Sequence, residues 1–209
     1  THKAGYAQDS LYSTELRQGS WTSPHMISLQ GINPYISQTA FDDMGDAIVV
    51  WQQTEGISSQ VYRNEYRNHT WSGPIAMTPQ GVSTYFAQVS MDNIGNAIIV
   101  WQQMVNNIGQ IFMSEYRSGQ WKDSAITSSG SMATRPLVKM DASGNAILLW
   151  NQESGTDWQL FRKQYVDGKW QDASLVATSH NQLNNIMYDV SMNGSGDIDM
   201  VWDTLDQNV

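Results

Sequence analysis

A nine-residue segment recurs along the chain at a nearly constant spacing. Its clearest copy, residues 95–103, reads Gly-Asn-Ala-Ile-Ile-Val-Trp-Gln-Gln. The tryptophans of successive copies are separated by 50, 49 and 52 residues; they are Trp51, Trp101, Trp150 and Trp202. A fixed period near 50 residues is typical of propeller blades or stacked repeats, and it constrains the fold more than any single residue does.

Each period divides into four short segments with strand character, separated by Gly, Asn, Asp and Pro. This spacing predicts an antiparallel meander, and no segment keeps the apolar period of a helix. The expected strands are 34–41, 46–53, 60–67 and 71–77, then 84–91, 96–103, 110–117 and 121–127, then 134–140, 145–152, 158–165 and 170–176. The second strand of each copy is apolar on both sides, as expected of a strand buried between neighbouring sheets. The predicted fold class is all-β.

The two ends of the chain carry complementary halves of the repeat. Residues 10–17 and 21–28 match the third and fourth segments, whereas 186–192 and 197–203 match the first and second. We therefore predict one domain, 1–209: a four-bladed β-propeller of four-stranded antiparallel blades. Its full blades are 34–77, 84–127 and 134–176, and the halves 6–28 and 186–203 form the remaining one. Closure requires 197–203 to pair with 10–17, in one chain or between the chains of a ring-closing homo-oligomer.

The repeated motif itself has a familiar form. Asp-x-x-Gly-Asn/Asp-Ala, an apolar run and Trp-x-Gln begin at Asp42, Asp92 and Asp141. This pattern resembles the repeat of many secreted or surface bacterial proteins with β-propeller folds, and the resemblance covers nearly the whole chain. It implies a propeller and a location outside a bacterial cell. It implies little about function, since such repeats are mostly attached to proteins of unknown role.

Composition excludes several classes of function. The formal charge of −9 and the pI of about 4.6 argue against nucleic acid or an anionic membrane as partner, because both attract a positive surface. No apolar run approaches the roughly 20 residues that span a bilayer, so no membrane insertion is expected. The absence of cysteine excludes disulfides, zinc thiolate sites and a Cys nucleophile. The four histidines occupy unrelated repeat positions, and we expect no metal and no cofactor.

The residues repeated in every copy are interpreted as structural. Asp42, Asp92 and Asp141 begin four-residue turns, where an Asx side chain bonds its own backbone. The tryptophans of the second strand are expected to pack between adjacent blades. Function usually depends on what differs between copies.

The candidate ligand-binding residues lie on the loop face, where the fourth-to-first and second-to-third connections emerge. Tyr35 and Tyr85 occupy equivalent positions there, Arg135 is one position further on in its own copy, and Trp158 follows a loop. The amides at the ends of the second strands are Gln53, Gln103 and Gln152. Aromatic rings beside amide and charged groups suit a carbohydrate, although tyrosines also anchor loops.

We therefore expect a non-enzymatic binding module for a glycan or a protein surface. One alternative is a glycoside hydrolase with Glu55 and Glu153, which lie in corresponding loops, as its two carboxylates. Another is a spacer unit of a larger surface protein. Catalytic side-chain sets are not evident in the sequence, and the question of enzyme activity stays open.

Overall fold

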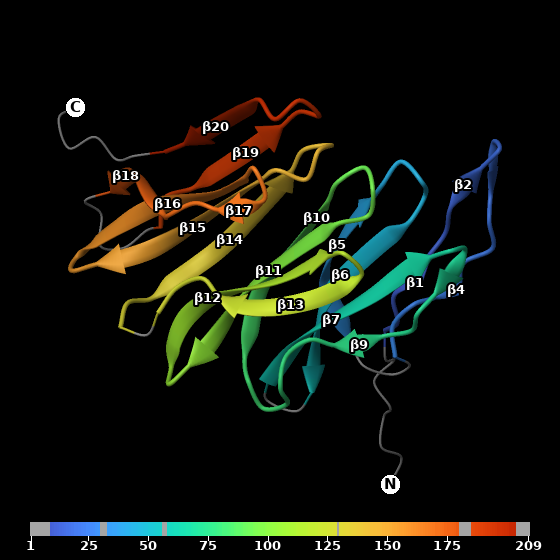
Figure 1. Ribbon diagram of the computed structural model, residues 1–209. Helices are drawn as coiled ribbons and strands as arrows, with labels where there is room; N and C mark the ends of the chain where they lie inside the picture. The colour runs from blue at the N-terminus through green and yellow to red at the C-terminus, as the bar shows by residue number, and fades with distance from the viewer. Residues whose placement is uncertain (1–8, 30–32, 56–57, 129, 180–184, 204–209) are drawn as a thin grey trace, which may run out of the picture.

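The computed structural model describes residues 9–29, 33–55, 58–128, 130–179 and 185–203 (Figure 1). Throughout these ranges the regular elements are β-strands, and every strand pairing is antiparallel. No helix of membrane-spanning length occurs in the described part of the chain. The all-β prediction is therefore confirmed.

Three complete sheets follow one another along the chain, each a meander in sequence order. The first sheet contains β5 (Pro34–Phe41), β6 (Ala47–Glu55), β7 (Ser58–Arg67), β8 (Thr70–Trp71) and β9 (Ile75–Ala76). The second contains β10 (Thr84–Met91), β11 (Ala97–Val105), β12 (Ile108–Arg117) and β13 (Gln120–Ala125). The third contains β14 (Ala133–Met140), β15 (Ala146–Ser154), β16 (Asp157–Val166), β17 (Lys169–Trp170) and β18 (Ser174–Ser179). The predicted strands agree with these bounds to within a few residues, except that the fourth strand is interrupted in the first and third sheets.

A hairpin stands at each end of this series. The N-terminal hairpin consists of β1 (Tyr12–Ser13), β2 (Leu16–Arg17), β3 (Ser20–Trp21) and β4 (His25–Met26), in which β1 pairs with β4 and β2 with β3. The C-terminal hairpin consists of β19 (Tyr188–Met192) and β20 (Ile198–Trp202). The sheets and hairpins together form a curved series, with the two hairpins at its opposite ends (Figure 1).

The predicted closure by pairing of 197–203 with 10–17 is not present in this structure. Among the described strands, β20 pairs only with β19, and β1 pairs only with β4. The described sheets and hairpins therefore form an open arc rather than a closed ring (Figure 1).

Apolar side chains of the second strands fill the interfaces between successive sheets. They point to both sides of their sheet and are almost completely buried, because each complete sheet lies between two neighbours. The three interfaces join Ile48 and Val50 to Met91, Ala97 and Ile99; Ile98 and Val100 to Met140, Ala146 and Leu148; and Ile147 and Leu149 to Val190. The second-strand tryptophans of the three complete sheets, Trp51, Trp101 and Trp150, are buried as predicted, whereas Trp202 is exposed.

The turns between the first and second strands are built by the repeated aspartates. Oδ1 of Asp92 accepts hydrogen bonds from the backbone N–H groups of Ile94 and Asn96, at 3.0 and 2.8 Å. Asp42 and Asp141 make the same pair of bonds in their own turns. The prediction that these aspartates shape turns is confirmed.

At the other end of the sheets, polar side chains connect neighbouring sheets. The Gln52 amide donates to the carbonyl of Thr84 at 2.6 Å. Oγ1 of Thr134 donates to Oε1 of Gln102 at 2.7 Å, and the Asn151 amide donates to the carbonyl of Ile186 at 2.8 Å. Each interface between sheets therefore carries a buried hydrogen bond that fixes how far one sheet is displaced along the next.

A buried carboxylate also connects the first sheet to the second. Glu65 accepts hydrogen bonds from Arg63 at 2.8 Å, from Arg67 at 3.0 Å and from the indole of Trp121 at 2.9 Å. Burial by itself would raise the pKa of Glu65, but the hydrogen bonds from Arg63, Arg67 and Trp121 outweigh it and hold the pKa below its ordinary value.

We expect Glu65→Gln to lower the free energy of unfolding by about 1–3 kcal/mol at neutral pH, because two guanidinium groups lose their acceptor. A carboxylate whose pKa is lowered by folding stabilises the protein above its unfolded pKa, and this stabilisation is lost as the pH falls through the folded value. The difference between wild type and variant should therefore shrink in acid. Urea unfolding across a pH series measures it, with the exposed Glu153→Gln as control. A difference that stays constant with pH would contradict the assignment.

Candidate functional site

The first strand of each complete sheet contains an irregularity close to the loop face. The pairing register shifts between Tyr35 and Gln38 in the first sheet, between Tyr85 and Gln88 in the second, and between Thr134 and Leu137 in the third. Such bulges reorient side chains and are frequent near binding sites. They occur at the same repeat position each time.

The bulges hold two large side chains on an unfavourable backbone. Phe86 has φ of 55° and Arg135 has φ of 54°, in the left-handed region that bulky residues rarely adopt. Backbone strain of this kind persists only where the surroundings enforce it, and it is concentrated at functional sites. We call the set Tyr35, Tyr85, Phe86 and Arg135 the bulge surface.

Aromatic rings and one guanidinium meet on the bulge surface. The ring centroids of Tyr85 and Phe86 are 6.3 Å apart, with the planes tilted by 44°. Cζ of Arg135 lies 5.7 Å from the centroid of Phe86, and Nη1 of Arg135 lies 3.1 Å from Sδ of Met187. Tyr35 and Tyr85 are 38% and 42% exposed, so their rings are available to a ligand.

A small cavity of about 180 Å³ opens beside these residues. Phe86, Arg135 and Met187 line it together with Tyr188, whose hydroxyl donates to the backbone carbonyl of Arg135. Burial raises the pKa of Tyr188 far above its ordinary value, so the phenol stays protonated and keeps this hydrogen bond. This hydrogen bond from the half-buried tyrosine helps to hold the Arg135 backbone in its left-handed conformation.

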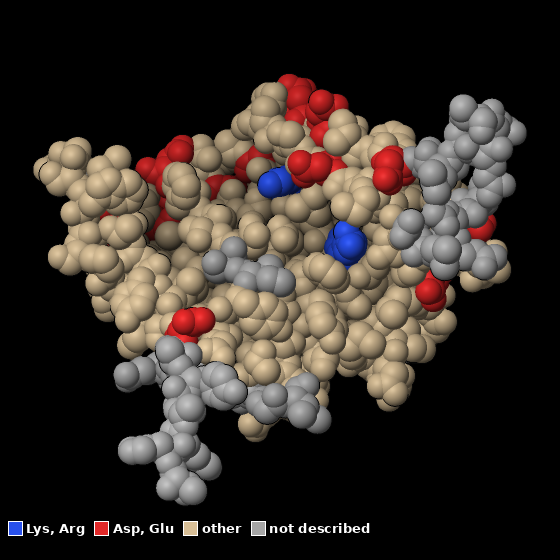
Figure 2. Space-filling view, turned by 180° about the vertical axis from the view of Figure 1, so that it is seen from behind, with Lys and Arg blue, Asp and Glu red and all other residues tan. Residues whose placement is uncertain are grey.

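The surroundings are poor in positive charge. The chain has 20 acidic residues and 11 Lys and Arg residues. Seen from behind, the molecule shows acidic residues mainly over its upper part, with others at the sides, and few basic residues (Figure 2). Arg135 therefore places one of the few cations of this chain beside the ring of Phe86, which neighbours the exposed ring of Tyr85.

The predicted amide side chains form hydrogen bonds with the second-strand tryptophans. The Oε1 atoms of Gln53, Gln103 and Gln152 accept the indole N–H of Trp51, Trp101 and Trp150 at 3.2, 3.3 and 3.2 Å. Gln53 is completely buried, so its side chain is not presented on the surface. These contacts give the three amides a structural role beside the second-strand tryptophans.

Trp158 does not join the bulge surface. It lies on β16, two strands away from β14 in the third sheet, and it is paired with Glu153 and Ser179. Phe86 was not predicted as a site residue, because adjacent residues of a regular strand point to opposite faces and only the bulge brings Phe86 next to Tyr85.

The hydrolase alternative requires Glu55 and Glu153 to face one cleft. Glu153 is exposed on β15, and the side chain of Glu55 lies outside the described residues. Across the ranges that the structure describes, no group of His, Asp and Glu side chains is arranged to hold a metal ion.

No protein-family model and no curated protein matches the chain. Several solved structures are similar. A polysaccharide lyase, the PL25 ulvan lyase, is 12% identical with a TM-score of 0.60, covering 90% of this chain and 53% of the lyase. A protein of unknown function from Dyadobacter fermentans is 13% identical with a TM-score of 0.52, covering 83% and 60%. An endo-arabinase from Bacteroides thetaiotaomicron is 16% identical with a TM-score of 0.48, covering 82% and 69%. The chain thus shares its fold with the lyase and spans about half the length of the lyase.

Proposed function

We propose that this chain is a glycan-binding module whose ligand lies along the bulge surface. The observation that carries the proposal is the guanidinium of Arg135 beside the half-buried ring of Phe86, which neighbours the exposed ring of Tyr85, on backbone held in a strained conformation. Rings of Tyr35, Tyr85 and Phe86 offer flat apolar surfaces to sugar rings. Arg135 offers several donors to hydroxyl or acidic groups.

Arg135 favours an acidic polysaccharide within the glycan class. A guanidinium binds a carboxylate or sulfate through two parallel hydrogen bonds, and it does so more strongly than it binds neutral hydroxyls. The ulvan lyase with the related fold was solved bound to -[GlcA(1-4)Rha3S]-, which contains glucuronic acid. That ligand class is the first to test here, although the low identity carries over the fold alone.

The proposal extends to architecture and location. We take the three complete sheets to be blades of a bacterial β-propeller, as the repeat motif predicts, with the bulges on their innermost strands. Polysaccharides of this kind are extracellular, which fits a secreted or surface protein. The use of the module as a spacer in a larger surface protein stays a prediction.

Arg135→Ala should weaken binding of an acidic polysaccharide about tenfold to a hundredfold, because the ligand loses a charge-assisted hydrogen bond worth about 1.5–3 kcal/mol. Tyr85→Ala should weaken it by a similar factor through lost stacking. Isothermal titration with a glucuronate-containing polysaccharide and a neutral one measures both effects.

Two control variants distinguish binding at the bulge surface from binding elsewhere on the protein. Arg162→Ala removes an exposed cation from the outer strand β16, and Ile94→Ala removes an exposed apolar side chain from a turn; neither should change the affinity. Binding that is absent, or equally strong in all four variants, would refute the bulge surface as the site.

A further inference from the structure

Each complete sheet contains one stacked aromatic pair that joins its second and third strands. The pairs are cross-strand neighbours whose ring centroids are 5.8, 6.1 and 5.7 Å apart, with planes within 17, 16 and 13° of parallel; they are Trp51 with Tyr62, Trp101 with Phe112 and Trp150 with Phe161. All three tryptophans are buried. The stacked pair therefore occurs in every complete copy of the repeat.

A fourth pair of the same kind is split between the two ends of the arc. Trp202 on β20 has the position of the second-strand tryptophans, and Tyr12 on β1 has the position of Tyr62. Their side chains are 45% and 59% exposed, although in the complete sheets both partners are mostly covered. Each of the two aromatic residues thus lacks the partner that the repeat provides.

The strands that carry them also lack neighbours. In a complete sheet the second strand pairs with the first and third, and the third pairs with the second and fourth. Among the described strands, β20 has only β19 and β1 has only β4. Backbone groups on such edges readily pair with another chain.

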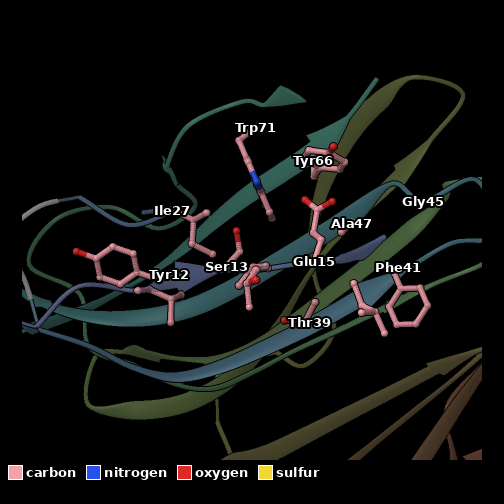
Figure 3. Close-up of a pocket in the computed structure, with 14 residues that line it drawn as sticks. Tyr12, Ser13, Glu15, Ile27, Thr39, Phe41, Gly45, Ala47, Tyr66 and Trp71 are labelled. Atoms are coloured by element: carbon pink, nitrogen blue, oxygen red, sulfur yellow. The ribbon is translucent and has the colours of Figure 1, made fainter. Parts of the chain in front are cut away.

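A cavity lies where the first and second strands of the N-terminal repeat would cover the first sheet. It measures about 650 Å³ and separates the N-terminal hairpin from the first sheet (Figure 3). Thr39, Phe41, Ala47 and Val49 line it from the first sheet. The corresponding faces of the second and third sheets, which include Met91 and Met140, are covered by apolar side chains of the preceding sheet, among them those of its second strand. Phe41, without such cover, is 75% exposed.

We infer that the C-terminal hairpin of one copy of this chain completes the N-terminal hairpin of a second copy and fills this cavity. We assign the partner half to a second copy because, within the described residues, the two halves lie at opposite ends of the arc and do not pair with each other (Figure 1). The complete sheets fix the register: β20 runs antiparallel to β1 and β2, with Trp202 opposite Tyr12 and Ile198 opposite Leu16. Two such contacts, made reciprocally, close a ring of two chains.

The residue at position 199 is expected to weaken this contact between copies. Asp199 replaces an isoleucine that is fully buried in each complete sheet, at Ile48, Ile98 and Ile147. In the same register Asp199 lies opposite Glu15, as Ile48 lies opposite Glu65. Two like charges directly across a strand pair are destabilising, so the association is expected to be reversible and weak at neutral pH.

Sedimentation velocity of the full chain over a range of concentrations tests the inference. The mass should rise from one copy to two. Trp202→Ala and Tyr12→Ala should each weaken association at least tenfold, and the double variant should be little weaker than either single variant. Asp199→Ile should strengthen association at least tenfold. Ile94→Ala, at an exposed site in the turn between β10 and β11, is the control and should change nothing.

A disulfide cross-link shows whether the C-terminal hairpin that pairs with β1 comes from the same copy of the chain or from a second copy. Val201 and Ser13 are opposite each other in the expected register, and the native chain has no cysteine. Val201→Cys with Ser13→Cys should give a disulfide-linked dimer under oxidising conditions. Closure within a single chain, no cross-link, or a monomer that persists even in Asp199→Ile would each overturn the inference. None of these readouts depends on glycan binding.

Discussion

Trp101→Ala should destabilise the protein by about 3–5 kcal/mol, the range for truncating a large buried aromatic residue. The Trp101 side chain lies between the first and second sheets, stacks on Phe112 and donates its indole N–H to Gln103. Its removal leaves a cavity at the centre of the arc and an amide without its partner. Chemical unfolding followed by circular dichroism measures the loss.

Trp101→Phe provides the matched comparison. It keeps a ring beside Phe112 but loses the hydrogen bond and part of the volume, so a loss of about 1–2 kcal/mol is expected. Trp202→Ala in the monomer should cost less than either, because that side chain is exposed. An equal loss for Trp101→Ala and Trp202→Ala would mean that the aromatic pairs do not hold the sheets together.

Gly144→Ala should cost about 2–4 kcal/mol, by adding a clash to a left-handed backbone. Gly144 has φ of +85°, and a Cβ there would lie 2.8 Å from Oδ2 of Asp92 and 3.0 Å from Nη1 of Arg117. Arg117 also donates to the Gly144 carbonyl at 2.8 Å. The substitution therefore disturbs the contact between the second and third sheets as well as its own turn.

Gly119→Ala isolates the backbone contribution. Gly119 has φ of +80°, but nothing lies within 4 Å of a Cβ built on it. It should cost only about 1–2 kcal/mol, the strain of the left-handed conformation alone. Thermal unfolding of both variants gives the difference, and equal losses would show that the packing of one turn against the next contributes nothing.

Local features of this fold were predictable because the residues that form them recur in each copy of the repeat. Each turn aspartate, such as Asp92, is followed by its glycine at a fixed distance, and each second strand ends its apolar run with tryptophan. These patterns determine hydrogen bonds within a few residues of one another. Strand order and the roles of the repeated residues therefore followed from the sequence.

Two other features could not be predicted from the sequence, for physical reasons. Whether the ends meet depends on a small rotation between sheets, accumulated along the arc, and no single residue encodes it. The positive φ of Phe86 and Arg135 has no sequence signal, because glycine or asparagine is the usual occupant of that conformation. For the same reason the bulge surface was predicted through Tyr35, Tyr85 and Arg135 but without its central ring.

The contacts at both ends of each interface have a mechanical consequence. Buried polar bonds such as Gln52 to Thr84 hold the sheets at the loop end, and turn contacts such as Arg117 to Gly144 hold them at the other. Neighbouring sheets therefore have little freedom to hinge, and equivalent positions on them, such as Tyr35 and Tyr85, keep a constant separation. If a polymer lies along the proposed bulge surface, this constant separation would select polymers by the length of their repeating unit.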